Sequence, residues 1–300
     1  MRLPDFLIVG APKCGTTTMH EILKQHSQIF LPSEKEIHFF DNNKNFSKGI
    51  NWYKNYFKNV AHDKVAGDIT PSYMYYDYAI KRIYDTFGSN VKIIFMLRNP
   101  ADRAFSEYSY NLSRGLIKEQ NFEKALSLEV INKDLPPFER RYFSFISRGY
   151  YGQYIQNFLE YFPEKNLHFI LFEDEFLKDP QKCVKELQEF LGVKYEKLNT
   201  DLKSNTGFVP HYPGINKLIY DPNPIRSVLK KMIPVYTLRK ELKELVKEIN
   251  SNKKVKQAKL SIEVKNNLLQ EYYQRDIIAT EKLISKDLSS WGIKNKGYES

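Results

Sequence analysis

The sequence is poor in cysteine: Cys14 and Cys183 are the two in 300 residues. Neither has neighbours at the spacing of metal ligands, which argues against both a disulfide framework and a zinc site. The chain also lacks a run of about eighteen apolar residues, the length that spans a bilayer. A strand is predicted to start at Phe6, almost at the initiator methionine, so we expect no signal peptide and a cytoplasmic protein, unless an anchor has been trimmed away.

What is present is a large apolar fraction and a positive charge. Hydrophobic residues make up 42% of the chain and aromatic residues 14%, enough to bury a sizeable core. The net charge of +10 indicates an anionic partner, such as a nucleotide, an acidic polysaccharide, a nucleic acid or a membrane surface. A solvated helical face is the simpler interpretation of the lysine-rich stretch near 226–259, and we prefer it to a peripheral membrane contact. No nucleic-acid motif is present, so we expect no nucleic-acid partner, and the oligomeric state is not indicated.

Short apolar segments alternate with helical patterns along most of the chain, which predicts an α/β fold with a mainly parallel sheet. A helix is expected to start near Gly15 and another near Ala101. Residues 200–224 read as a long loop, and residues 225–300 as a helical extension of a single domain that spans 1–300. The predicted strands lie in Phe6–Val9, Lys64–Pro71 (ending at Asp68), Val91–Pro100 and Asn166–Asp174.

The segment IVGAPKCGTTT, residues 8–18, has the glycine spacing of a phosphate-binding loop but a displaced lysine. Strand, glycine loop and helix follow one another here, so unpaired N–H groups and the helix dipole favour an anion. The alternative is a glycine turn with a threonine cap. Lys13 precedes Gly15, whereas in nucleoside-triphosphate enzymes a lysine follows the second glycine and reaches the β- and γ-phosphates. This loop therefore suits a nucleotide with a 5′-phosphate and one further group, without an obligatory metal.

A second anion clamp is predicted at Arg98 and Ser106. Arg98 ends a predicted strand, where open α/β sheets bind ligands, and Ser106 follows about two helical turns later. An arginine fork and a helix hydroxyl suit a phosphate. A surface ion pair is the alternative for Arg98, but its coincidence with the loop at 8–18 favours the phosphate.

PKCGTT at 12–17 and RNPADRAFS at 98–106 resemble the two cofactor motifs of sulfotransferases that use 3′-phosphoadenosine 5′-phosphosulfate (PAPS). The likeness extends through GDITPSY, RGYYGQY, FEDEFLKDP and Trp291. It implies a P-loop-like three-layer α/β fold, with the 5′-phosphosulfate at the first motif and the 3′-phosphate at Arg98 and Ser106. It also implies a tyrosine near the nucleotide at Tyr151 and a loop over the adenine around Thr206. The implied cofactor-binding residues are Lys13, Cys14, Gly15, Thr16, Thr17, Thr18, Arg98, Ser106, Tyr151, Asn205, Gly207 and Phe208.

Glu36, in SEKEIHFFD (33–41), is the predicted general base. Sulfuryl transfer to a hydroxyl needs a group that takes the acceptor proton, and cations such as Lys13 that hold charge on the leaving phosphate. The segment resembles the E-x-H-F-F-D stretch of heparan-sulfate-type carbohydrate sulfotransferases, in which the glutamate is the base. His38 is the rival base or a neighbour that positions sulfate or acceptor. An exposed carboxylate beside Lys35 is the alternative for Glu36.

One departure from the heparan-sulfate type concerns the acceptor. Those enzymes carry E-K-[ST]-P where this chain has Asp68-Ile69-Thr70-Pro71, so the role of the family lysine is not carried over and a heparan-like acceptor is less well supported. Asp68, Tyr73 and His38 are the candidate acceptor-binding residues. Acceptor specificity is expected in the loops at 42–62, 113–147 and 203–224.

The sequence thus predicts a PAPS-dependent sulfotransferase that acts on a hydroxyl, most readily of a saccharide or glycan, and needs no metal. One alternative is a P-loop nucleotide kinase that uses ATP and Mg²⁺, with Asp68 as a metal ligand. The other is a non-catalytic protein that binds nucleic acid or membranes through its basic surface.

Overall fold

The computed structural model describes residues 2–135, 140–202 and 259–292. The chain divides into two compact units. The first unit comprises Met1–Arg103, Ile146–Ser204 and Lys265–Ser300, and the second comprises Ala104–Phe145 and Asn205–Val264. The single domain that the sequence predicts stays a prediction.

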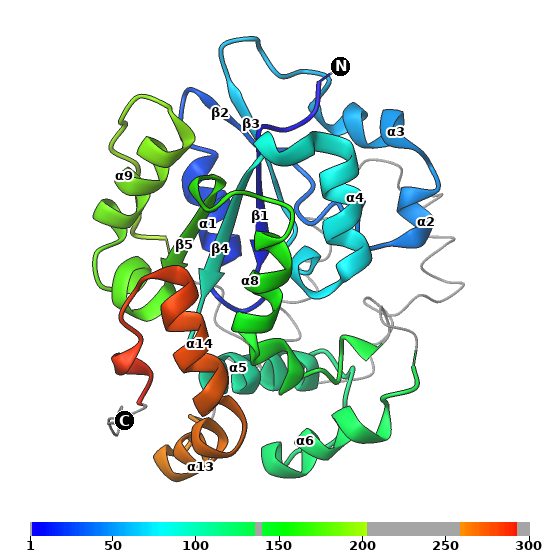
Figure 1. Cartoon of the computed structure of the whole chain (residues 1–300), viewed down its shortest axis with the longest axis vertical. Coiled ribbons are helices and arrows are strands. Elements are labelled where there is room, and N and C mark those ends of the chain that lie inside the picture. Colours follow the sequence, from blue (N-terminus) through cyan, green and yellow to red (C-terminus); the bar gives the residue numbers. More distant parts are fainter. Residues whose placement is uncertain (1, 136–139, 203–258, 293–300) are drawn as a thin grey trace, which may run out of the picture. The chain divides into compact units, whose positions relative to one another are not determined.

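The first unit is built on a five-stranded sheet in which every strand pair is parallel, with the order β2-β3-β1-β4-β5 (Figure 1). β1 lies in the middle, and its Phe6 pairs with Gly67 of β3 on one side and Lys92 of β4 on the other. All of β1 is buried, as expected for a parallel strand covered on both faces. The strands are β1 Phe6–Gly10, β2 Ile29–Phe30, β3 Val65–Ile69, β4 Lys92–Leu97 and β5 Leu167–Leu171.

Helices flank this sheet, so the predicted α/β fold with a parallel sheet is confirmed. α8 packs against α14, where Gly152 of α8 lets the backbones approach: an added Cβ would lie 3.0 Å from Asp276 Oδ1 of α14. The helices of the first unit are α1 Thr16–Leu23, α2 Asn43–Phe46, α3 Ile50–Lys54, α4 Asp77–Phe87, α8 Tyr151–Leu159, α9 Pro180–Leu191 and α14 Gln274–Ile284. α5 Pro100–Ser113 and α13 Ile262–Leu268 each run across the boundary between the units.

Four predicted strands are confirmed as β1, β3, β4 and β5, with corrected ends. The strand predicted to reach Asp174 ends at Leu171, and Phe172–Leu177 forms a π-helix instead. β2 was not predicted, because two residues give no periodicity. The predicted helical C-terminal part is confirmed for 262–284, whereas residues 203–258 lie outside the described residues.

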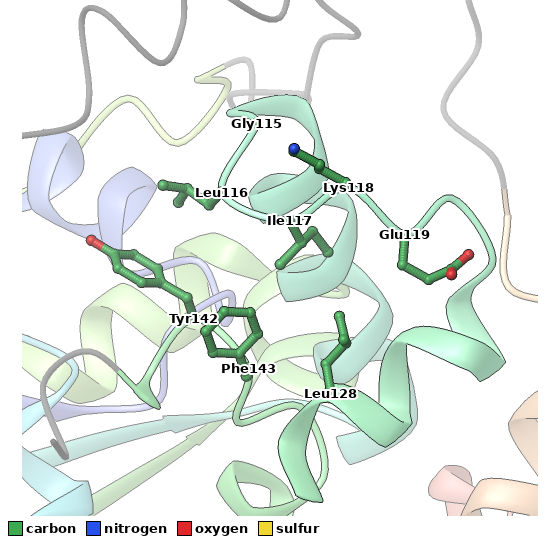
Figure 2. A pocket seen from close by; sticks show the side chains of 8 residues that line it. All are labelled: Gly115, Leu116, Ile117, Lys118, Glu119, Leu128, Tyr142 and Phe143. Atoms are coloured by element: carbon green, nitrogen blue, oxygen red, sulfur yellow. The ribbon is translucent and has the colours of Figure 1, made fainter. Parts of the chain in front are cut away.

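The second unit contains the rest of α5 and α6 Phe122–Ile131, which meet through aromatic rings. Phe122 contacts Phe105 with ring centroids 5.1 Å apart and Tyr108 at 5.2 Å. A cavity of about 480 Å³ lies in this unit (Figure 2), within the segment 113–147 where acceptor specificity is predicted. Its lining residues are Gly115, Leu116, Ile117, Lys118, Glu119, Leu128, Tyr142 and Phe143.

In the part of the chain that the structure describes, no helix has the length and apolar composition needed to cross a membrane.

Candidate active site

The candidate site lies at the carboxyl edge of the sheet. All five strands are parallel, so the segments that follow β1, β3, β4 and β5 leave the sheet at one edge. β2 and β3 lie on one side of β1, and β4 and β5 lie on the other. The order in which successive strands are added to the sheet therefore switches sides at β1. Open α/β sheets bind ligands at such a switch point, which makes the loop after β1 the natural centre of a site.

The loop after β1 is the segment in which the sequence predicts an anion cradle. Gly15 has φ 85° and is the N-cap of α1, a backbone conformation that favours glycine. No described side chain caps the helix, and its first turn contains no acidic residue. The first N–H groups of α1 therefore remain available to an anion.

The side chains of this loop differ in exposure. Thr16 is buried, Thr17 is exposed, and Lys13 and Thr18 are half-buried. Cys14 is fully buried, with Sγ 3.6 Å from the carbonyl oxygen of Pro12, and burial raises the pKa of its thiol to about 12. Cys14 can therefore offer a ligand its backbone but not a thiolate.

The structure brings Arg98, directly after β4, to this loop. Arg98 Nη1 donates to the carbonyl oxygen of Lys13 at 3.3 Å, joining two motifs 85 residues apart. The ion pair considered for Arg98 also exists: Nε donates to Glu173 Oε1 at 3.2 Å. The guanidinium lies 5.0 Å from the ring centroid of Phe172, and Tyr151 donates its hydroxyl to the Arg98 carbonyl at 2.9 Å. Arg98 is thus fixed beside the cradle.

Tyr151 and Ser106 differ in how they relate to Arg98. Tyr151 is fully buried and meets Trp291 edge to face at 5.9 Å, so it supports the Arg98 backbone from the core. Ser106 is half-buried on α5 in the second unit, and its part in a phosphate clamp stays a prediction. Asn205, Thr206, Gly207 and Phe208 lie outside the described residues.

Glu36 reaches the same edge of the sheet because its N–H donates to the carbonyl of Ile69, the last residue of β3, at 3.2 Å. Its side chain is 44% exposed. Lys35 Nζ lies 2.7 Å from Glu36 Oε1, and His38 Nε2 lies 3.5 Å from Oε2. The other ring nitrogen of His38 lies 2.9 Å from Oδ2 of Asp41. Glu36 is therefore a solvent-facing carboxylate held between two cations.

The charges around Glu36 set its protonation state. Desolvation works to raise its pKa, but the Lys35 ammonium and His38 outweigh it and hold the pKa well below the usual range. For His38, burial works to lower the pKa, but hydrogen bonds and charge from Asp41 and Glu36 raise it to about 10. At neutral pH the pair is a carboxylate beside an imidazolium. In this state the Glu36 carboxylate has room for a proton and the doubly protonated His38 ring has none, although the lowered pKa also makes Glu36 a weaker base.

Asp68 and Tyr73, the other candidate acceptor-binding residues, lie in the core. Asp68 is 1% exposed and accepts hydrogen bonds from the hydroxyls of Tyr53 at 3.0 Å, Tyr73 at 2.9 Å and Thr70 at 2.9 Å. Burial raises the pKa of Asp68 to about 6, although these donors oppose the shift. Ile69, which replaces the family lysine, is buried at the end of β3. Contact of Asp68 or Tyr73 with an acceptor stays a prediction; in the structure Asp68 accepts from these hydroxyls, and the Tyr73 hydroxyl also accepts from the N–H of Phe39 at 3.1 Å.

Three charged residues of the site were not selected from the sequence: Lys35, Asp41 and Glu173. Asp41 is fully buried and accepts a hydrogen bond from Ser72 Oγ at 2.5 Å as well as facing His38. Its spacing of three residues from His38, inside the quoted segment 33–41, was an available signal. Glu173 gave no such signal, because its partner Arg98 is 75 residues away.

Residues 3–206 match the sulfotransferase domain family. Because the match covers more than half of the chain, this protein belongs to that family of enzymes, and the resemblance drawn from the two motifs is confirmed. A sulfotransferase from Alicyclobacillus acidocaldarius has the same fold, with a TM-score of 0.69 and 24% identity over 97% of this chain and 99% of that one.

The curated relatives sulfate heparan sulfate, as their names state. The bifunctional heparan sulfate N-deacetylase/N-sulfotransferase 2 of Bos taurus is 32% identical over 198 residues, which are 64% of this chain and 22% of that protein. The heparan sulfate glucosamine 3-O-sulfotransferase 5 of Mus musculus is 27% identical over 69% of this chain and 59% of its own. The 3-O-sulfotransferase 6 of Mus musculus is 34% identical over 64% and 53%. The chain thus spans between about a fifth and three fifths of these relatives' length.

Proposed function

We propose that this protein transfers a sulfuryl group from PAPS to a hydroxyl of a saccharide, with Glu36 as the general base. The proposal depends on one observation: Arg98 donates a hydrogen bond to the carbonyl of Lys13, in the loop after β1. Glu36 lies at the same edge of the sheet, where its N–H donates to the carbonyl of Ile69. Two separate anion-binding features and an ionised carboxylate are what a transfer between an anionic donor and a hydroxyl requires.

The donor set suits the two phosphates of 3′,5′-bisphosphoadenosine. The N-terminus of α1 offers backbone N–H groups without a described capping side chain, and the threonines that begin the helix add hydroxyls. Arg98 lies beside this loop and offers a planar fork of N–H donors, which suits a phosphate. When bound, PAPS supplies the sulfuryl group, which passes to the acceptor oxygen as its bond to the 5′-phosphate breaks.

In this mechanism Glu36 takes the proton of the acceptor hydroxyl as the new S–O bond forms. His38 stays protonated, and with Lys35 it keeps the carboxylate ionised and oriented. Lys13 and the amides at the start of α1 hold the negative charge that grows on the leaving phosphate. No step in this scheme requires a metal ion.

The kinase alternative is less well supported by the geometry of Asp68. In that alternative Asp68 would hold Mg²⁺, yet both of its carboxylate oxygens accept hydrogen bonds from buried hydroxyls and the residue is 1% exposed. Titration calorimetry with ATP–Mg²⁺ and with 3′,5′-bisphosphoadenosine separates the two functions. We expect tight binding of the bisphosphate, and a preference for ATP–Mg²⁺ would refute the proposal.

The acceptor class is tested by transfer of labelled sulfate from PAPS to a panel of saccharides, glycolipids and phenols. The names of the relatives include both N- and 3-O-sulfotransferases, so the panel contains glucosaminides with a free amine and with an acetylated amine. We expect label on the saccharide in both forms, because a hydroxyl is present in each. Label only where the amine is free would assign the nitrogen as acceptor.

The base is tested by Glu36→Gln, which keeps the shape of the side chain and removes its charge. We expect kcat to fall by about 10²–10⁴-fold, the usual contribution of a general base, while the affinity for 3′,5′-bisphosphoadenosine is kept. Glu34→Gln is the matched control, because Glu34 is an exposed carboxylate two residues away. Near wild-type turnover of Glu36→Gln would exclude Glu36 as the base.

A further inference from the structure

The segment that carries Glu36 and His38 has an uncommon backbone. Glu36 has φ 64° and His38 has φ 52°, both in the left-handed region that residues with a Cβ seldom occupy. Among the described residues, the other non-glycine residues with positive φ are Lys13 and Ser285. Such conformations cost free energy and persist where surrounding contacts impose them. The contacts that impose this one therefore determine where the Glu36 carboxylate points.

Both ends of the segment are held from the sheet side. The N–H of Glu36 donates to the carbonyl of Ile69 at 3.2 Å, and the N–H of Phe39 donates to the hydroxyl of Tyr73 at 3.1 Å. These two bonds fix the first and last residues. They do not hold the two carbonyl groups between them, at Ile37 and His38.

The side-chain amide of Asn45 holds both of these carbonyls. Its Nδ2 donates to the carbonyl oxygen of Ile37 at 3.2 Å and to that of His38 at 3.0 Å. The opposite end, Oδ1, accepts from Lys48 Nζ at 2.8 Å. An ammonium group only donates and a carbonyl group only accepts, so chemistry fixes which end of the amide faces the segment.

Asn45 is itself well anchored. It belongs to α2, whose N-cap Asn42 accepts from the backbone N–H groups of Lys44 at 2.9 Å and Asn45 at 3.3 Å. Asparagine suits this position for a simple reason. Its side chain is short and carries two N–H donors on one atom, whereas aspartate would place a carboxylate against two carbonyl oxygens.

We infer that Asn45 is a positioning residue for the proposed transfer: by holding the carbonyls of Ile37 and His38, it sets the orientation of the Glu36 carboxylate toward the acceptor. This inference rests on the proposed function. Asn45 is not among the predicted donor-binding residues, and its amide is used by this segment and by Lys48.

The test uses the full chain with Asn45→Ala and Asn45→Asp, and Asn90→Asp as a control for the added charge. Asn90 is exposed at the opposite, amino end of β4. We expect kcat to fall by roughly tenfold to a hundredfold in both Asn45 variants, the size of effect that a displacement of about 1 Å has on a reacting group. The KM for PAPS and the Kd for 3′,5′-bisphosphoadenosine should stay at the wild-type values, and Asn90→Asp should leave all three unchanged.

A double-mutant cycle separates positioning from a general structural role. Because Asn45 acts through Glu36, adding Asn45→Ala to Glu36→Gln should cause little further loss of kcat. Losses that multiply, an unchanged kcat in Asn45→Ala, or a lost affinity for the bisphosphate would each overturn the inference. If instead the wild-type protein transfers no sulfate, the proposed function itself is wrong. If Glu36→Gln is fully active, the assignment of the base is wrong. The same measurements distinguish these two outcomes.

Discussion

Replacing Arg98 by methionine should weaken binding of the nucleotide specifically through its 3′-phosphate. Arg98 is 24% exposed, and its described hydrogen bonds use Nε toward Glu173 and Nη1 toward Lys13. Those bonds leave the two N–H groups of Nη2 for a ligand. Methionine keeps the length of the aliphatic stem over the Phe172 ring but removes every donor and the charge.

The magnitude follows from the bonds lost. A hydrogen bond to a charged group contributes about 1.5–3 kcal/mol, and each 1.4 kcal/mol changes Kd about tenfold, so Kd should rise by about 10- to 150-fold. Glu173 lies against the guanidinium and repels a phosphate, so we expect the lower part of this range. Burial raises the pKa of Glu173, although the Arg98 charge opposes this shift.

Calorimetry with two ligands makes the test sharp. The affinity of Arg98→Met for 3′,5′-bisphosphoadenosine should fall, whereas its affinity for adenosine 5′-phosphate, which lacks the 3′-phosphate, should be nearly unchanged. Arg275→Met is the control, because Arg275 is an exposed arginine on α14 and its replacement removes the same charge. Equal losses for both ligands would mean that Arg98 does not read the 3′-phosphate. An unchanged affinity for both ligands would show that Arg98 does not contact the nucleotide.

Three further outcomes are expected. Gly15→Ala should lower the free energy of unfolding by at least about 1–2 kcal/mol, because φ is 85° and the added Cβ would lie 2.7 Å from Phe172; an unchanged urea midpoint would contradict this. Tyr151→Phe removes a buried hydrogen bond to Arg98 and should cost about 0.5–1.5 kcal/mol of stability together with a weaker affinity for the bisphosphate, both measurable on one sample. The pKa of His38 is raised to about 10 in the folded protein. Its contribution to the free energy of unfolding is therefore fully present below pH 6.5 and is lost as the pH rises to about 10. The difference in unfolding free energy between wild type and His38→Gln should therefore shrink over that range, and a constant difference would show that His38 is not paired as described.

The sheet could be predicted because its strands are continuous apolar runs bounded by glycine or by Asn-Pro. β1 and β4 show this pattern, and the parallel order places Gly15 and Arg98 at one edge without any tertiary information. β2 could not be predicted, since two residues carry no period. The π-helix after β5 also gave no signal, because Phe172–Leu177 continues the apolar-acidic pattern of a strand end.

The backbone conformation of the candidate site could not be predicted from the sequence. Nothing in SEKEIHFFD signals positive φ at Glu36 and His38, because the segment has no glycine; tertiary hydrogen bonds impose that backbone. The burial of Asp68 was equally hidden. From the sequence, an acidic residue at a strand end resembles a ligand for a metal or an acceptor. The structure shows instead that the Asp68 carboxylate accepts a hydrogen bond from the hydroxyl of Tyr53, 15 residues away.

The stretch 286–291 contacts the neighbourhood of Arg98 from the far end of the sequence. Lys286 pairs with Glu175, Ser290 donates to Asp174 at 2.6 Å, and the carbonyl of Trp291 accepts from Asn99, the residue after Arg98, at 3.0 Å. During synthesis, the glycine loop and its arginine emerge long before these partners. The base segment can find its contacts within the first 75 residues, whereas the phosphate side must wait for residue 291. The segment of the proposed base thus has its contacts early in the chain, whereas the proposed nucleotide-binding edge is contacted by residues near the end of the described chain.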